Sequence, residues 1–131
     1  MKEFRKIFQM VTFCTNRPMQ QGINDFLQQR EGYLELSDFY QKKRDCFLSA
    51  IGESKFKPIA AAGSYFQLLH CGDIFEGSDF EIASQIANEH KVCGIPISVF
   101  YTSGRDDGYV RFCFAKTEET LKDAGKKLSQ I

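Results

Sequence analysis

An alternating stretch near the end of the sequence places one arginine where it could bind a carboxylate. The segment Tyr109–Ala115 has the period-two pattern of a strand, and Val110, Phe112 and Phe114 share its core face. Arg111 then lies on the opposite face, where its guanidinium can offer a rigid fork of donors to both carboxylate oxygens. The pattern alone favours the other interpretation, a solvated arginine on an open sheet face.

Two His-Cys pairs have the residue types of a zinc site. The pairs are His70-Cys71 and His90-x-x-Cys93. Adjacent residues on a strand point to opposite faces, so His70 and Cys71 can hardly bind the same ion. We therefore interpret the two pairs as unrelated ends of strands and helices, and we predict no metal site.

The segment Ser54-Lys55-Phe56-Lys57 fits the S-x-x-K motif of β-lactamase-like enzymes, whose serine is a nucleophile. In those enzymes the motif opens a helix, but here Pro58 follows Lys57 and disfavours helix at that position. The partner motifs of such enzymes are missing as well. We therefore name no catalytic residue from the sequence.

Three helices are predicted over the first 52 residues. The first has apolar residues at helical spacing: Phe4, Ile7, Phe8 and Val11. It ends near Phe13, and Asn16 can cap a second helix, which Glu31–Gly32 interrupts. The third helix begins around Ser37, a candidate N-cap, and ends at Gly52.

The second half of the sequence predicts a small sheet with helices packed against it. The expected elements are a buried strand over Ser64–Leu69, a helix from the capping box Ser78-Asp79-Phe80-Glu81 to about His90, a short strand and loop over 91–100, a turn at Asp107-Gly108, the strand Tyr109–Ala115 and a last helix capped by Thr117. This sheet would position Arg111.

Composition limits the class of protein. The chain has 131 residues and 15.0 kDa, enough for one domain, and its 43% apolar and 26% charged residues exclude intrinsic disorder. Because 17 basic residues balance 17 acidic ones, we predict no nucleic-acid partner. No apolar run reaches membrane-spanning length. Five cysteines without a CxxC motif, and no secretory signal, indicate reduced thiols and a cytoplasmic protein.

Four segments in chain order resemble the C-terminal third of fold-type I aminotransferases that use pyridoxal phosphate. They are MKEFRKIFQMVTFCTNRPMQ, FKPIAAAGSYFQL, GIPISVFY and VRFCFAKTEETLKDAGKKL. The similarity is greatest to the branch of methionine and kynurenine–oxoglutarate aminotransferases. It implies an α/β enzyme whose small C-terminal domain, an α+β piece by itself, packs helices on a largely antiparallel sheet. Residues 1–30 would end the large domain and form a connecting helix, and residues 31–131 would form the small domain.

The resemblance also implies roles for individual residues. Arg111 matches the arginine that binds the α-carboxylate of the amino-acid substrate. The resemblance therefore favours carboxylate binding over a solvated arginine. Phe13 matches an aromatic near the substrate pocket of the neighbouring subunit in related dimers. Tyr65 and the pair Phe100-Tyr101 match segments at the border of the active-site entrance.

The chain departs from the family at the cofactor. The family's Schiff-base lysine lies upstream of the segment matching MKEFRK, and Lys57 does not fill its place. Three other cofactor contacts of the family are missing too: the aspartate that pairs with the pyridine nitrogen, the aromatic residue that stacks on the ring, and most contacts to the phosphate. We therefore expect a C-terminal fragment, inactive alone, that does not hold pyridoxal phosphate by itself and lacks its N-terminal large domain.

The complete enzyme would be a homodimer that binds pyridoxal phosphate. It would transfer the amino group of an L-amino acid of methionine, glutamine or aromatic type to a 2-oxo acid. The alternative is a stand-alone, non-catalytic domain that binds small molecules or proteins. In that case the aromatic residues are only core, and Arg111 is solvated.

Overall fold

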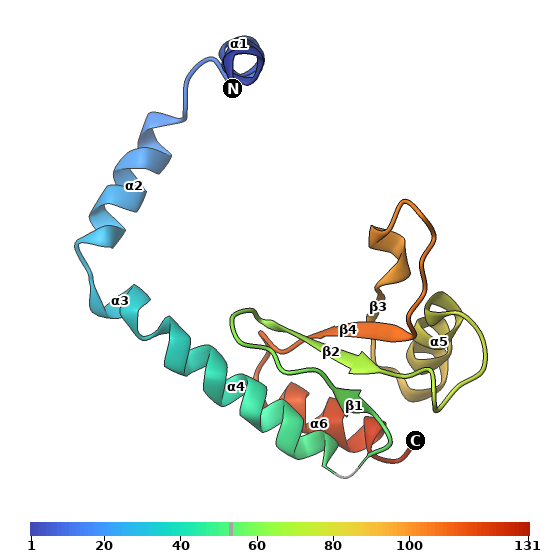
Figure 1. Ribbon diagram of the computed structural model, residues 1–131. Coiled ribbons are helices and arrows are strands. Elements are labelled where there is room, and N and C mark those ends of the chain that lie inside the picture. The colour runs from blue at the N-terminus through green and yellow to red at the C-terminus, as the bar shows by residue number, and fades with distance from the viewer. Residues whose placement is uncertain (53) are drawn as a thin grey trace. The chain divides into compact units, whose positions relative to one another are not determined.

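The computed structural model describes residues 1–52 and 54–131 (Figure 1). The chain divides into two units, Met1–Leu36 and Ser37–Ile131. The second unit contains the sheet and the hydrophobic core, and it therefore carries the candidate site.

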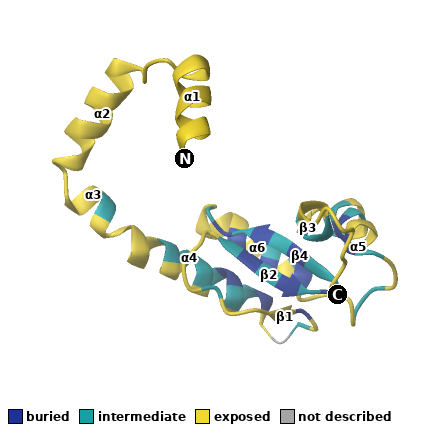
Figure 2. Cartoon of the chain, turned by 45° about the horizontal axis from the view of Figure 1, so that its top comes forward, coloured by how far each residue is buried: buried dark blue, intermediate teal, exposed yellow. Residues whose placement is uncertain are grey.

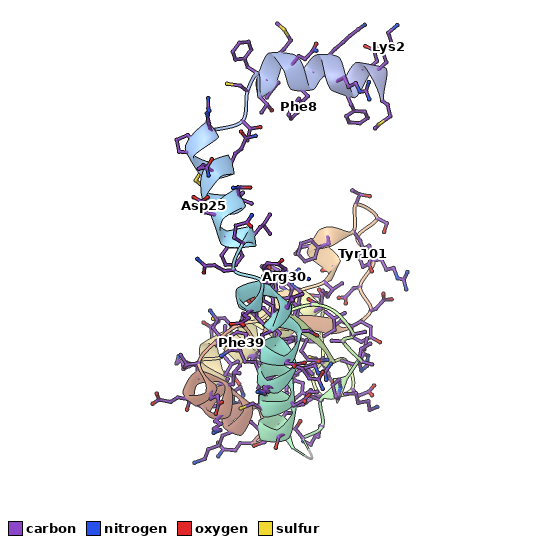
Figure 3. All side chains as sticks on the ribbon, turned by 90° about the vertical axis from the view of Figure 1, so that its left-hand side faces the viewer. Lys2, Phe8, Asp25, Arg30, Phe39 and Tyr101 are labelled. Atoms are coloured by element: carbon purple, nitrogen blue, oxygen red, sulfur yellow. The ribbon has the colours of Figure 1, made fainter. Side chains whose placement is uncertain are left out.

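The first unit consists of helices without a core. They are α1 (Lys2–Val11), α2 (Arg17–Leu27) and the short α3 (Glu31–Leu34). As expected, Asn16 caps α2 by accepting a hydrogen bond of 3.2 Å from the Met19 amide. Figure 2 shows these helices almost entirely exposed, and Tyr33 alone among residues 1–36 is half-buried. Their apolar side chains, including Phe8 in Figure 3, therefore face outward.

The helix boundaries in this region lie close to the predicted positions but differ in detail. The first helix ends at Val11, and Phe13 lies beyond it with a positive φ of 56°. Glu31–Gly32 opens α3 instead of only interrupting a helix. A Cβ added to Gly32 would lie 3.6 Å from the Phe26 ring. Ser37 is no N-cap, because the backbone is already right-handed helical at Glu35 and the next helix begins one residue before Ser37.

The second unit is built around a four-stranded antiparallel sheet. Helix α4 (Leu36–Ile51) leads into it and ends, as predicted, at Gly52 with a φ of 58°. The strands lie in the order β1-β2-β4-β3. Their bounds are β1 Lys57–Pro58, β2 Phe66–His70, β3 Ile95–Pro96 and β4 Tyr109–Cys113.

The core lies on one face of the central strands. Val110, Phe112 and Phe114 are all buried, which confirms the predicted face of β4. They form one cluster with residues of α4 and of the final helix α6 (Glu118–Leu128), which Thr117 caps as expected. A Cβ added to Gly125 of α6 would lie 2.4 Å from the Ala50 Cβ, so α4 and α6 pack closely through a glycine.

A helix and a turn follow β2. The predicted capping box is confirmed: the Ser78 hydroxyl accepts from the Glu81 amide, and the Glu81 carboxylate accepts from the Ser78 amide. Helix α5 (Asp79–Gln85) continues as the π-helical turn η1 (Ile86–His90), so helical structure reaches His90 as expected. After β3 comes the single 3-10 turn η2 (Ser98–Phe100).

The strand ends differ from the predicted ones for local reasons. The Ser64 hydroxyl accepts from the Phe66 amide at 3.0 Å, so Ser64 is in a turn and β2 starts at Phe66. The Lys116 amide bonds the Phe114 carbonyl at 2.8 Å, which turns the chain and ends β4 before Ala115. Strand β1 was not predicted.

Two further findings concern the described residues. Over 1–52 and 54–131, no helix is long and apolar enough to cross a membrane. Within the same ranges, no group of three or more His, Cys, Asp or Glu side chains is arranged to hold a metal ion.

Candidate functional site

The Arg111 guanidinium is held between two aromatic rings. Its Cζ lies 4.1 Å from the centroid of the Phe66 ring and 4.8 Å from that of Phe100. Both positions are favourable for a cation over a ring face. The Arg111 Nε is buried and has no hydrogen-bond partner among the residues that the structure describes. Because an unpaired buried donor costs free energy, the site is suited to a bound acceptor.

The same arginine lines a cavity of about 380 Å³. The lining is mostly apolar, and Arg111 is its one charged side chain among the described residues: Ile59, Ala60, Ala61, Ser64, Phe66, Leu68, Ile97 and Arg111. A pocket of this kind can bind an anionic group at the guanidinium and an apolar group against its walls.

The sheet register explains why these side chains meet. Leu68 of β2 pairs with Arg111, and Phe66 stands two residues along on the same face of β2. On the other side of β4, Ile95 of β3 pairs with Arg111. The turn η2 follows β3 within a few residues and carries Phe100. Three elements therefore converge on one guanidinium.

A row of aromatic rings extends from the site. The Phe66 ring lies 4.4 Å from Tyr65, centroid to centroid, and Tyr65 lies 6.1 Å from Tyr40 of α4. Tyr40 in turn meets Phe39 edge-on at 5.2 Å. Ring pairs at such distances attract one another, so α4 supports the wall of the Arg111 cavity.

The structure brings together only some of the residues proposed from the sequence. Phe100 contacts Arg111, and Tyr65 stands behind Phe66. Tyr101, labelled in Figure 3, has its ring 5.7 Å from the Arg105 guanidinium instead. Phe13 belongs to the first unit and is 86% exposed.

Sequence reasoning missed Phe66 as a site residue. The signal was present in the strand pattern, since Phe66 and Leu68 alternate with the buried Gln67 and Leu69. If that strand pairs antiparallel with the Arg111 strand, the outward residues of both lie on one face. The register was the missing information.

The other chemical motifs lie away from the cavity. Cys71 is fully buried, and this burial raises the pKa of its thiol to about 12. His70 packs edge-on against Tyr109 with ring centroids 5.0 Å apart. Lys57 lies in β1, which confirms that Pro58 disfavours helix there, and its ammonium lies 2.5 Å from the Asp73 carboxylate. This hydrogen bond lowers the pKa of Asp73.

The side chains of the cavity do not fit a pyridoxal phosphate site. Such a site needs a lysine for the Schiff base and donors for a phosphate. Among the described residues, the cavity lining includes no lysine, and its single cation is the stacked Arg111. The donor set present suits one carboxylate.

Comparisons of sequence agree with the earlier resemblance. A family model of aminotransferases of class I and II matches residues 4–128. Methionine aminotransferase of Escherichia coli is 38% identical over 98% of this chain and 34% of its own length. Human kynurenine–oxoglutarate transaminase 1 is 25% identical over 98% of this chain and 36% of its own length. The chain thus spans about a third of the curated relatives that it matches.

Comparisons of structure give the same result. A solved Escherichia coli protein with a methionine aminotransferase function superposes with a TM-score of 0.91 at 37% identity, over 99% of this chain and 34% of that one. N-Succinyldiaminopimelate aminotransferase of Mycobacterium tuberculosis shares the fold, with a TM-score of 0.79 at 22% identity over 93% of this chain and 32% of that one. Because the family model matches nearly the whole chain, the chain belongs to the aminotransferases of class I and II.

Proposed function

We propose that this chain is the part of an aminotransferase that binds the substrate's α-carboxylate, and that Arg111 makes the bond. The observation that carries the proposal is the stacked guanidinium at an apolar cavity, with its buried Nε unpaired within residues 1–52 and 54–131. A carboxylate would pair with that donor and a neighbouring N–H of the same fork. The complete enzyme would transfer the amino group of an L-amino acid to a 2-oxo acid.

The substrate class that we propose is an amino acid with an uncharged side chain, of methionine, glutamine or aromatic type. The apolar walls formed by Ile59, Leu68 and Ile97 support it, because a charged side chain would be desolvated there without a partner. The similarity to a methionine aminotransferase also supports it.

Pyridoxal phosphate would serve the complete enzyme as an electron sink. We place its binding in a large domain outside this chain, because the Arg111 cavity does not fit it. Residues 1–30 would then end that large domain and connect it to the small domain, 31–131. In the small domain, Arg111 orients the substrate, and Phe66 and Phe100 keep water from the guanidinium.

We also propose that the complete enzyme is a homodimer in which Phe13 lies toward the neighbouring subunit's substrate pocket. The backbone of Phe13 supports a specific role, since a positive φ of 56° is strained for a bulky residue. The exposed apolar residues of α1 fit a helix that other parts of the enzyme cover: Phe4, Ile7, Phe8 and Val11.

The proposal is tested first on the 131-residue chain. L-Methionine and L-methioninamide differ at the carboxylate, so the affinity for each is measured by titration calorimetry, and in the unaltered chain the Arg111 Nε–H resonance is also followed by NMR. We expect methionine to shift this resonance and to bind more tightly than its amide. In Arg111→Met the preference should disappear. Equal binding of the two ligands by the unaltered chain would contradict the proposal.

A second test uses the complete enzyme. Loss of a desolvated, charge-assisted pair costs about 2–5 kcal/mol, so Arg111→Ala should lower kcat/KM by roughly one and a half to nearly four decades. Arg111→Lys should be weaker than the parent but better than alanine, since lysine offers a point charge without the fork. A change within about threefold, under 1 kcal/mol, would make Arg111 an ordinary surface residue.

The cofactor is tested on the chain alone. We expect no transamination after addition of pyridoxal phosphate, and no stoichiometric labelling of one lysine after borohydride reduction. A single labelled lysine together with amino-acid turnover would overturn the placement of the cofactor outside this chain.

A further inference from the structure

A buried carboxylate stands behind the turn that carries Phe100. Asp79, in the first turn of α5, is fully buried, with a relative exposure of 0%. Its Oδ2 accepts from the Ser98 amide at 2.7 Å, and its Oδ1 accepts from the Ser98 hydroxyl at 2.5 Å. Ser98 is the first residue of η2. Both oxygens of one carboxylate are thus used to fix a single residue of the turn.

The other end of the same loop is bound to α5 as well. The Asp106 carboxylate accepts from the Asp79 amide at 2.8 Å through Oδ2, and from the Gly108 amide at 2.8 Å through Oδ1. The Ile97 amide, before the loop, donates to the Tyr109 carbonyl at 3.1 Å. The segment 98–106 is therefore tied at both ends to the N-terminus of one helix.

Phe100 needs this support because its own packing is small. Phe100 is 57% exposed, and its ring lies against the Arg111 guanidinium, 4.8 Å from the Cζ to the ring centroid. The turn η2 has only three residues, and turns of this length are weak without external bonds. The position of the ring over the guanidinium therefore depends on the backbone of Ser98.

We infer that Asp79 is a positioning residue for substrate-carboxylate binding: it fixes Ser98, Ser98 fixes η2, and η2 holds Phe100 against Arg111. The inference rests on the proposed function for its consequence on binding, but its first part concerns the ligand-free chain alone. Alanine at position 79 removes both acceptors. Asparagine would be a poor test, because its oxygen could still accept from the Ser98 amide and its amide group could donate to the Ser98 hydroxyl.

The experiment uses the full 131-residue chain and two readouts. The first is the Arg111 Nε–H resonance without ligand, which the ring currents of Phe66 and Phe100 displace. The second is the ratio of affinities for L-methionine and L-methioninamide. A merely destabilising change would weaken both ligands and leave this ratio unchanged.

Asp79→Ala and Ser98→Ala are the test variants, and Ser98→Thr retains the hydroxyl and should restore the wild-type values. Ser84→Ala is the control, since the Ser84 hydroxyl bonds the Phe80 carbonyl on the same helix. In Asp79→Ala the ligand-free resonance should lose part of its displacement, and the affinity ratio should fall roughly fivefold or more, as for a lost buried hydrogen bond. Ser84→Ala should change neither.

The outcomes separate the two proposals. If Asp79→Ala and Ser98→Ala fold, by the dispersion of their amide spectra, and keep the wild-type resonance, the inference is wrong. If Asp79→Ala does not fold, Ser98→Ala decides alone. If the resonance moves as expected but Arg111→Met keeps the preference for methionine, the positioning is supported and the carboxylate-binding function is wrong.

Discussion

The two units of the chain bury similar residues to opposite extents. In α1 the side chain of Phe8 is 58% exposed, whereas in the second unit Phe114 is 1% exposed. Both units contain helices with caps and apolar stripes. A local pattern is therefore enough to specify a helix, but a core needs partners distant in sequence, and only Ser37–Ile131 supplies them. In the first unit the sequence forms a helix with an apolar face, but that face stays exposed.

The largest expected effect of this difference is on stability. Phe114→Ala should lower the free energy of unfolding by about 3–5 kcal/mol, because it leaves a cavity in the core. Phe8→Ala should change it by less than about 0.5 kcal/mol, because no core forms around α1. Urea unfolding followed by circular dichroism measures both. Equal costs for the two variants would show that α1 packs like a core helix.

Two glycines sharpen the comparison. Gly125→Ala should destabilise the second unit by about 1–3 kcal/mol, because the new Cβ would overlap Ala50. Gly22 of α2 has nothing within 4 Å of an added Cβ, so Gly22→Ala should stabilise its helix by up to about 1 kcal/mol. Far-ultraviolet circular dichroism should show more helix in Gly22→Ala, and urea unfolding should show the loss in Gly125→Ala. A stabilising Gly125→Ala would refute the close packing of α4 on α6, and a destabilising Gly22→Ala would show that Gly22 packs against other residues.

One buried cysteine gives the stability a dependence on pH. Burial raises the pKa of Cys71 from its ordinary value of 9.0 to about 12, so the folded chain keeps this proton after the unfolded chain has released it. The free energy of unfolding should therefore fall as the pH rises from about 9 to 12, by up to about 1.4 kcal/mol per pH unit. Cys71→Ala should flatten this part of the stability profile. Cys14→Ala should not, because Cys14 is exposed in the first unit.

The smallest effects concern helix caps. Ser78→Ala should cost about 1 kcal/mol of global stability, because α5 packs on the core. Asn16→Ala removes the same kind of bond from α2, where the loss should be confined to local helicity. Amide hydrogen exchange distinguishes the two: Ser78→Ala should speed exchange in β2 and β4, and Asn16→Ala only in α2. Faster exchange in the sheet of Asn16→Ala would show that the units are coupled.

The sequence predicts those parts of the fold that depend on near neighbours. The caps at Asn16, Ser78 and Thr117 and the glycine stop at Gly52 all involve residues within a few positions, and all are confirmed. Strand β1 was missed because its two residues, Lys57–Pro58, have no pattern of their own. They form a strand only because they pair with Leu69 and His70.

The same limit applies to the candidate site. Alternation is enough to place Arg111 on the outer face, which the structure confirms, whereas its binding role stays a prediction. Phe66 required the register between β2 and β4. Asp79 looked like an ordinary acidic residue in a capping box, because its contact with Ser98 joins segments 19 positions apart.

The double attachment of the loop after η2 has a consequence for evolution and engineering. Gly104, within the segment 98–106, has a positive φ of 69° and nothing within 4 Å of an added Cβ among the described residues. Insertions at this point should lengthen only the exposed loop, because the bonds of Ser98 and Asp106 to Asp79 hold both ends of the loop on α5. The loop can therefore vary in length among relatives, or accept an inserted peptide tag, without moving Phe100 from the guanidinium.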